Sequence, residues 1–376
     1  MLLVREPDQE TLRETTARYL GGQADPATLR SLRDHPNGFD AGYWRDGVQL
    51  GWTHLLVDES HGGGSVSGHG LVDLGLLAHE FGSHAAPGPL AAAAVVAGAL
   101  SEAAGPIDVI EGLLAGELLA TWTGPLDPGL GTAASEVSAR IERGDVVLTG
   151  EARPVESVAA SAFVLVTAVG PEGLLQVLVP TDAKGCSETP LHSVDLTRRF
   201  STLRLEEVRL PHDAVVEHPA GAEAALRSQL LQLTVLGAAE SVGAMQSAFD
   251  MTLEWTKDRY TFGRQLASYQ AIKHRMAHLA MGLQASHAIS DEATEAVAVG
   301  EPDAAKLASA AAAYVGEVGS ELLQDCVQLH GGIGVTFEHD LHLFLRRHTL
   351  NRTLRGSPAE HRRRVTRELR AELSHS

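Results

Sequence analysis

The chain has 376 residues, of which 44% are hydrophobic, and it carries a formal net charge of -18 at pH 7. A chain of this length can bury more than one sizeable core, so we expect two or three domains. Nucleic acid and anionic membranes both require a basic surface, so the acidic balance argues against either as a general partner. Local basic clusters at 346–347 and 362–364 interrupt this acidic character.

The sequence shows little sign of targeting or of metal binding. The N-terminus lacks a basic region followed by a sustained apolar core, so we expect no signal peptide. The two cysteines, Cys186 and Cys326, lie far apart without the spacing of metal ligands. Neither a disulfide framework nor a metal site is therefore predicted. We expect a cytoplasmic protein that spans no membrane.

The first part of the chain has a helical pattern. Apolar residues recur at three-to-four spacing in 11–20 and again in 70–81, which is typical of amphipathic helices. Glycines 62–64 interrupt this pattern, as a turn would. A phosphate-binding loop would need a preceding strand, a lysine and a following helix around such glycines, and the sequence has none of these there. We predict an N-terminal helical domain over 1–117.

The pattern then changes to short runs rich in β-branched residues, separated by Gly, Pro and Asp. These runs predict strands, and they lie at 135–141, 146–148, 163–167 and 175–179. Such an arrangement is typical of a small antiparallel barrel or sandwich. We predict a middle β domain over 118–218.

Helical periodicity returns in long segments at 224–260, 269–299 and 303–329. Small residues facing one another along these segments indicate a tightly packed bundle, so we predict a C-terminal four-helix bundle over 219–376. Helices, then strands, then helices indicate an α+β multi-domain chain rather than a doubly wound sheet.

A candidate binding motif, Arg259-Tyr-Thr-Phe262-Gly263, follows the first of these long helices. Gly263 can break the helix, and the guanidinium of Arg259 can offer a fork of donors to phosphate oxygens. By itself this pattern is more typical of a solvated helix end. The segment continues through Gln270 into the next helix.

A second candidate motif, Gln328-Leu-His-Gly331-Gly332-Ile-Gly334, ends the last long helix in a glycine turn. Without side chains in the way, backbone N–H groups of such a turn can approach a ligand. The signal is weak when taken alone, because glycine turns commonly cap helices.

Together, these two segments resemble the FAD-binding segments of the acyl-CoA dehydrogenase family, and weaker matches at 56–64 and 200–211 extend the resemblance over nearly the whole chain. The resemblance implies that FAD is shared across a subunit interface, with its adenosine diphosphate half on these C-terminal segments. The residues that it assigns to FAD are Arg259, Phe262, Gln270, Gln328, Gly331 and Gly332.

The resemblance fails at the catalytic base, which is a glutamate in this family. The commoner position for that glutamate falls on Arg355, and the alternative position falls on Leu233. Neither can accept the substrate proton, so we predict no catalytic residue in this chain. Glu240 and Glu360 are candidates for a displaced base, but each lies at least one helical turn, about 5.4 Å, from the expected position.

The middle domain departs from the family in a similar way. Trp122-Thr-Gly-Pro125 lacks the acidic residue of the family's turn, and Pro154-Val-Glu156 stands where the family places Trp-Ile-Thr against the flavin ring. Proline has no backbone N–H to donate, and a glutamate would repel electron-rich reduced flavin.

These departures favour a non-catalytic subunit of a heteromeric (α2β2) acyl-CoA dehydrogenase, similar to the bacterial branch that acts on steroid-side-chain thioesters. A homologous partner would then supply the catalytic glutamate and bind most of the acyl-CoA, with electron-transfer flavoprotein as the candidate electron acceptor. Two alternatives stay open: a homomeric flavoenzyme with a displaced base or different flavin chemistry, and a flavin-free scaffold or interaction protein.

Overall fold

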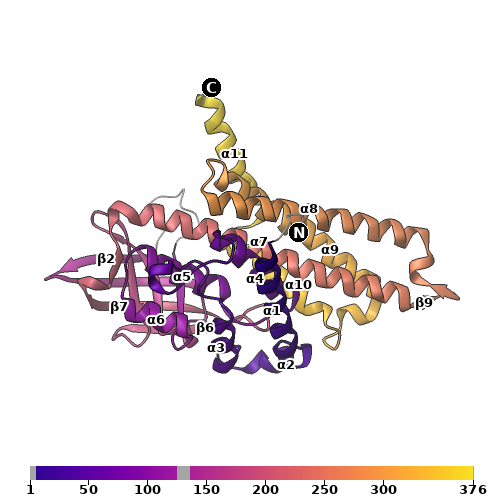
Figure 1. Cartoon of the computed structure of the whole chain (residues 1–376), viewed down its shortest axis with the longest axis horizontal. Coiled ribbons are helices and arrows are strands. Elements are labelled where there is room, and N and C mark those ends of the chain that lie inside the picture. The colour runs from indigo at the N-terminus through magenta and orange to yellow at the C-terminus, as the bar shows by residue number, and fades with distance from the viewer. Residues whose placement is uncertain (1–5, 125–135, 376) are drawn as a thin grey trace.

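The computed structural model describes residues 6–124 and 136–375 of the chain (Figure 1). Its N-terminal part is helical, as the periodicity predicts. The turn predicted at the glycines begins with Gly62, whose φ of 85° lies in the left-handed region that favours glycine. The N-terminal helices are α1 Pro7–Gln23, α2 Pro26–Ser31, α3 Ala41–Gln49, α4 Gly70–Ser83, α5 Leu90–Glu102 and α6 Ile107–Ala115.

A single β-sheet follows. Its strands are β1 Ala120–Thr123, β2 Val137–Glu142, β3 Asp145–Glu156, β4 Phe163–Gly170, β5 Gly173–Pro180, β6 Cys186–Leu191, β7 Phe200–Pro211 and β8 Val215–Glu217. They lie in the order β6-β7-β3-β2-β4-β5-β8, with β1 beside β4. Neighbours are antiparallel except that β4 pairs parallel with β1 and β2. The β2–β3 hairpin lies between β1 and β4 in sequence, so β4 can return beside β1 in the same direction.

The C-terminal part is again helical, with a small hairpin of β9 Tyr260–Thr261 and β10 Arg264–Gln265 after its first helix. The helices are α7 Pro219–Asp258, α8 Gln270–Val299, α9 Ala304–His330, α10 Leu341–Leu354 and α11 Pro358–His375. The predicted start of the first helix at 224 is late by five residues. Proline at the first helical position suits a helix start, because its missing N–H would have no partner there.

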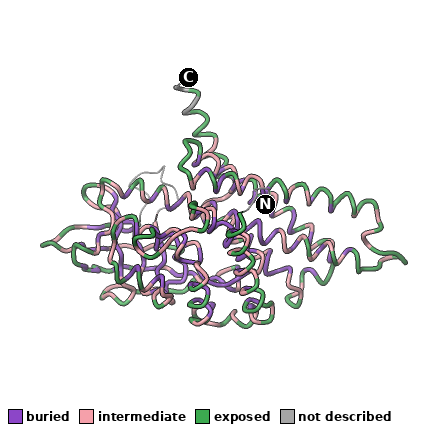
Figure 2. The backbone as a smooth tube through the Cα atoms, in the orientation of Figure 1, coloured by how far each residue is buried: buried purple, intermediate pink, exposed green. Residues whose placement is uncertain are grey.

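The sheet lies at one end of the molecule and the long helices extend to the other, with the N-terminal helices packed beside α7 (Figure 1). One apolar core joins the N-terminal helices to α7, α8 and α9, and a second core lies within the sheet. Buried residues run along much of α7. The first turns of α8, at the end away from the sheet, are mostly exposed (Figure 2). The division of the chain at 117 and 218 stays a prediction. No helix of the described residues is long and apolar enough to cross a membrane.

Helices α4 and α7 approach each other unusually closely. A Cβ atom at Gly82 would overlap the carbonyl oxygen of Glu240, and one at Gly243 would overlap the carbonyl oxygen of His79. Both overlaps involve backbone atoms, which cannot rotate away as a flexible side chain could. Glycine at these two positions therefore permits the contact that places Glu240 beside the N-terminal helices.

We predict that Gly243→Ala lowers the free energy of unfolding by about 1–3 kcal/mol, because the added methyl group overpacks the α4–α7 contact. Gly237→Ala on the same helix is the matched control, since no atom lies within 4 Å of a Cβ there. The control should raise stability by up to about 1 kcal/mol through helix propensity. Chemical denaturation of both variants measures this, and equal effects would contradict the close contact.

Candidate functional site

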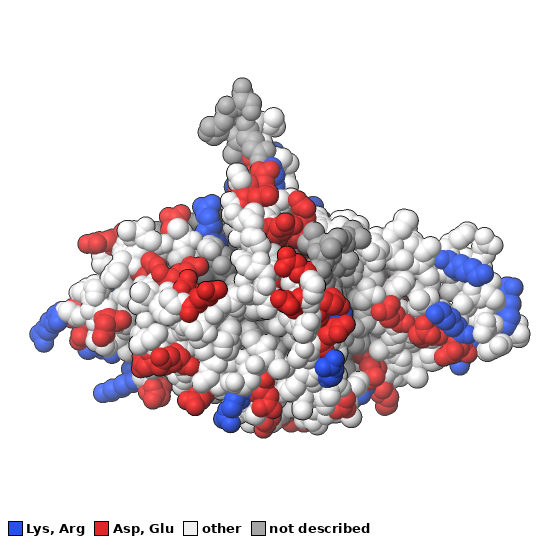
Figure 3. Space-filling model, viewed as in Figure 1, with Lys and Arg blue, Asp and Glu red and all other residues white. Residues whose placement is uncertain are grey.

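The residues of the first candidate motif lie at the far end of the helical bundle. Arg259 ends α7, and Gln270 begins α8. Phe262 lies in the hairpin between them with 99% of its surface exposed, and Arg259 and Gln270 are exposed as well. Several Lys and Arg side chains lie at this end of the molecule, with Asp and Glu side chains beside them (Figure 3). The exposed donors are therefore available to an anionic ligand.

The second motif lies at the same end, so the fold brings together segments that are about 70 residues apart. The guanidinium carbon of Arg259 lies 5.7 Å from the centre of the Trp255 ring. Trp255 in turn stacks on His330, with 5.1 Å between ring centres. His330 is the last residue of α9 and directly precedes Gly331. A continuous stack of rings thus links Arg259 to the glycine turn.

The glycine turn has room for a ligand. Gly331 has a φ of 68°, and a Cβ at Gly331 or Gly332 would meet no atom within 4 Å. Both glycines and Gln328 are exposed. An ion pair between Arg275 and Asp325 joins α8 to α9 close by. These features fit the approach of a phosphate-bearing group to exposed backbone and side-chain donors.

The two positions expected for a catalytic glutamate meet at a different place, nearer the sheet. Leu233 on α7 and Arg355 after α10 line one cavity. The guanidinium of Arg355 also lies over the Trp122 ring, with 5.5 Å to its centre. Burial lowers the pKa of Arg355 to about 10, so its side chain is still a cation at neutral pH. Among the residues that the structure describes, no carboxylate lines this cavity.

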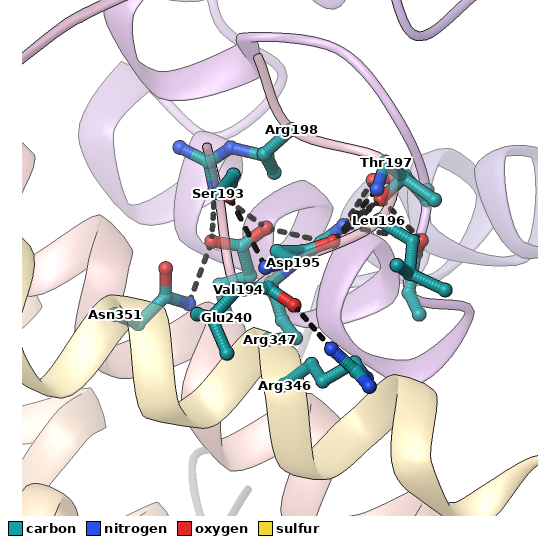
Figure 4. A network of polar contacts seen from close by, with 12 residues as sticks. Ser193, Val194, Asp195, Leu196, Thr197, Arg198, Glu240, Arg346, Arg347 and Asn351 are labelled. Atoms are coloured by element: carbon teal, nitrogen blue, oxygen red, sulfur yellow. Dashed lines mark hydrogen bonds and ion pairs between the residues drawn. The ribbon is translucent and has the colours of Figure 1, made fainter. Parts of the chain in front are cut away.

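Glu240, one of the two candidates for a displaced base, is held by surrounding donors (Figure 4). Its carboxylate accepts hydrogen bonds from Arg347 at 2.7 Å, from Asn351 at 2.8 Å and from Arg198 at 3.1 Å. Both carboxylate oxygens therefore point at guanidinium or amide donors. The geometry therefore argues against Glu240 as a proton acceptor for a substrate.

Glu360, the other candidate, is exposed and caps α11. It accepts hydrogen bonds from the backbone N–H and the hydroxyl of Ser357, both at 2.7 Å. These bonds lower the pKa of Glu360. Its position at a helix start explains it as a cap, and nothing in its surroundings makes it a base.

The sequence suggests that Glu156 lies against a flavin ring. In the structure its carboxylate contacts an arginine. Its side chain is 4% exposed and forms an ion pair with Arg198, which donates one hydrogen bond of 2.7 Å to it. Arg198 balances the charge of this carboxylate, which weakens the expected repulsion of a reduced flavin ring; that repulsion stays a prediction. Trp122 is likewise occupied, since its indole N–H donates to Gln229 on α7 at 2.8 Å. Pro125, also part of the altered motif, lies outside the described residues.

Arg347 is the centre of this region, and sequence reasoning placed it only in a basic cluster. It is fully buried and donates to the carboxylates of Asp195 and Glu240. It also donates to the backbone carbonyls of Ala85 at 3.1 Å and Ala86 at 2.8 Å. Although burial opposes it, the charge of Arg347 keeps the pKa of Asp195 below its usual value. Leu341, Phe344 and Arg347 are spaced like residues on one face of a helix, and all three are buried on α10. This spacing was a signal in the sequence that position 347 faces the core.

Comparisons with known proteins identify similar sequences and structures. Residues 220–370 match the family model of the acyl-CoA dehydrogenase C-terminal domain. The chain is 29% identical over 368 residues to acyl-CoA dehydrogenase IpdE2 of Mycobacterium tuberculosis, covering 96% of this chain and 97% of that protein. A variant of the Tcur3481–Tcur3483 steroid ACAD has a similar structure, with a TM-score of 0.86, 27% identity and coverage of 98% and 99%. The ChsE4–ChsE5 complex from Mycobacterium tuberculosis shares the fold, with the same TM-score and coverage at 22% identity.

We predict that Arg347→Met lowers the free energy of unfolding by about 3–5 kcal/mol, because it leaves the buried carboxylate of Asp195 without its cation. Arg346→Met is the matched control on the same helix, since Arg346 makes a single hydrogen bond to the Val194 carbonyl, at 3.0 Å. The control should stay within about 0.5 kcal/mol of the parent chain. Urea denaturation of both variants measures the difference.

Proposed function

The chain belongs to the acyl-CoA dehydrogenase family, and we propose that it is the non-catalytic subunit of a heteromeric member. In this proposal a homologous partner carries the catalytic glutamate and performs the α,β-desaturation of an acyl-CoA thioester. This chain holds the adenosine diphosphate half of the FAD at which that chemistry occurs. FAD supplies a ring system that accepts a hydride from the substrate.

One observation carries this proposal: the carboxylates nearest the expected reaction site are already bound by buried arginines. Glu240 binds Arg198 and Arg347, and Glu156 binds Arg198. Abstraction of a substrate proton requires a carboxylate within hydrogen-bond reach that is free to accept it. Because Arg355 and Leu233 stand at the two glutamate positions, this chain's own reaction site has cations and apolar groups where a base is needed.

The opposite end of the C-terminal bundle supports the FAD-holding role. There the exposed guanidinium of Arg259 can bind phosphate oxygens through two parallel hydrogen bonds. Gln270 and Gln328 offer amide donors and acceptors, and the open turn at Gly331 and Gly332 offers backbone N–H groups. Phe262, almost completely exposed in the lone chain, would gain an apolar contact on adenine or on the partner subunit.

The relatives support the existence of a partner. The Tcur3481–Tcur3483 steroid ACAD and the ChsE4–ChsE5 complex each pair two named proteins. By this analogy we propose a heterotetramer that acts on a bulky steroid-derived thioester, most of which the partner binds. Electron-transfer flavoprotein is the proposed electron acceptor.

Purification of the chain alone and together with a homologous partner tests the proposal. We expect the lone chain to bind little FAD and to show no dehydrogenase activity, because it has only one half of each flavin site. The mixed complex should be yellow and active. Visible absorbance and native mass measure both results. Stoichiometric FAD and activity in a verified homomer would overturn the proposal and favour a homomeric flavoenzyme.

Within the mixed complex, we predict that Gln328→Ala weakens FAD retention by about tenfold, because one hydrogen bond to a charged group is lost. Gln324→Ala is the matched control, since Gln324 is also exposed and lies one turn earlier on α9. The control should retain FAD like the parent complex. Flavin content after dialysis measures retention, and equal retention by both variants would argue against contact between Gln328 and FAD.

A further inference from the structure

Leu233 and Arg355 line a cavity. It differs from an acyl-binding site because its lining has no catalytic carboxylate. It is small, partly open and lies between α7, α9, α10 and the start of α11. Its walls on α7 and α9 include apolar groups such as Leu233 and Val315. Its other side is formed by Arg352, Arg355 and His361. One side of the cavity is thus apolar and the other is cationic.

The cavity lining contains no carboxylate. The chain has 48 Asp and Glu residues against 30 Lys and Arg, so a lining with two arginines and no acid stands out from the rest of the chain. The nearest carboxylate on α7, that of Glu240, is bound by Arg347 and Asn351. Burial keeps the pKa of His361 low, at about 4, so its imidazole is neutral at neutral pH. The charged side chains in the cavity lining are therefore the two arginines, and the Glu156 carboxylate acts on Arg355 from outside this lining.

Both arginines have hydrogen-bonding capacity left over. The Nε atoms of Arg352 and Arg355 are buried and have no hydrogen-bond partner. Arg355 makes one long hydrogen bond, 3.4 Å, to the carbonyl oxygen of its neighbour Leu354. Within the described part of the chain, neither guanidinium forms an ion pair. Buried donors without partners are costly, and an anion in the cavity would supply the missing acceptors.

We propose that this cavity binds a small monocarboxylate, whose carboxylate accepts hydrogen bonds from Arg352 and Arg355 and whose short apolar chain lies against Leu233 and Val315. The planar fork of a guanidinium matches a carboxylate. The apolar wall would leave the oxygens on the far side of a phosphate without donors. The cavity is small and partly open, which suits only a short ligand. This site does not depend on the FAD role and holds whether or not the chain binds flavin.

Calorimetric titration of the full chain at low salt tests the site, with sodium butyrate as the probe. We expect saturable binding of butyrate and none of butyramide, which has a similar shape but no charge. Arg355→Gln and Arg352→Gln should each weaken butyrate binding by about tenfold or more, because each removes a charge-assisted hydrogen bond. Arg363→Gln is the matched control: Arg363 is exposed on α11, so its loss should leave binding unchanged.

Several results would overturn this proposal. Absence of saturable butyrate binding to the folded chain would exclude the site. Equal binding of butyramide would show a purely apolar cavity, and tighter binding of inorganic phosphate would show a different class of anion. Unchanged butyrate binding by both arginine variants would show that the ligand binds elsewhere. Circular dichroism checks the fold of each variant, and the comparison of the three probes on the parent chain decides the question even if one variant fails to fold.

Discussion

The buried side chain of Arg347 is the interaction on which the arrangement of this protein depends. From α10 it reaches the carbonyls of Ala85 and Ala86 among the N-terminal helices, Asp195 beside the sheet and Glu240 on α7. A buried guanidinium is tolerated only when its donors find acceptors and its charge finds carboxylates. These partners come from all three parts of the chain, so the parts must meet in one geometry for the charge to be compensated (Figure 4).

The same constraint shapes what the site near the sheet can do. Because Glu240 balances the charges of Arg347 and Arg198, it is not available as a base. Glu156 is likewise bound in an ion pair with Arg198. The close contact of α4 with α7, which the glycines at 82 and 243 permit, holds this region together from the N-terminal side. In this region, where the family resemblance places the reaction site, Glu156 and Glu240 are thus bound in structural ion pairs.

The two ends of the C-terminal bundle therefore differ in character. The end beside the sheet contains buried ion pairs and the cavity lined by Arg352 and Arg355. The far end presents exposed donors and an exposed aromatic ring at Phe262. An exposed apolar group among ligand donors has a natural place in an assembly, where a second chain or a cofactor covers it. This contrast is the physical argument for our proposal that the chain holds a cofactor and does not itself perform the chemistry.

Local pattern in the sequence was sufficient for the class of fold and for most of its elements. The spacing of apolar residues predicts the long helices to within a few residues, and the predicted strand run 175–179 lies within β5. Helix starts were less certain, since Pro219 extends α7 beyond its apolar pattern. The parallel pairing of β1 with β4 was not predictable, because register between distant strands is set by packing rather than by local preference.

For the candidate site, the sequence alone determined which residue types stand where: the two glycine-containing motifs, and an arginine and a leucine in place of a base. What each charged group does was decided only by the tertiary structure. Arg198 and Glu156 are 42 residues apart, and Arg347 and Asp195 are 152 apart. Burial and charge compensation arise when such distant side chains meet in a region of low dielectric, so no local pattern reveals them. The sequence thus places an arginine and a leucine where a base is expected, and the fold pairs Glu240 and Glu156 with buried arginines.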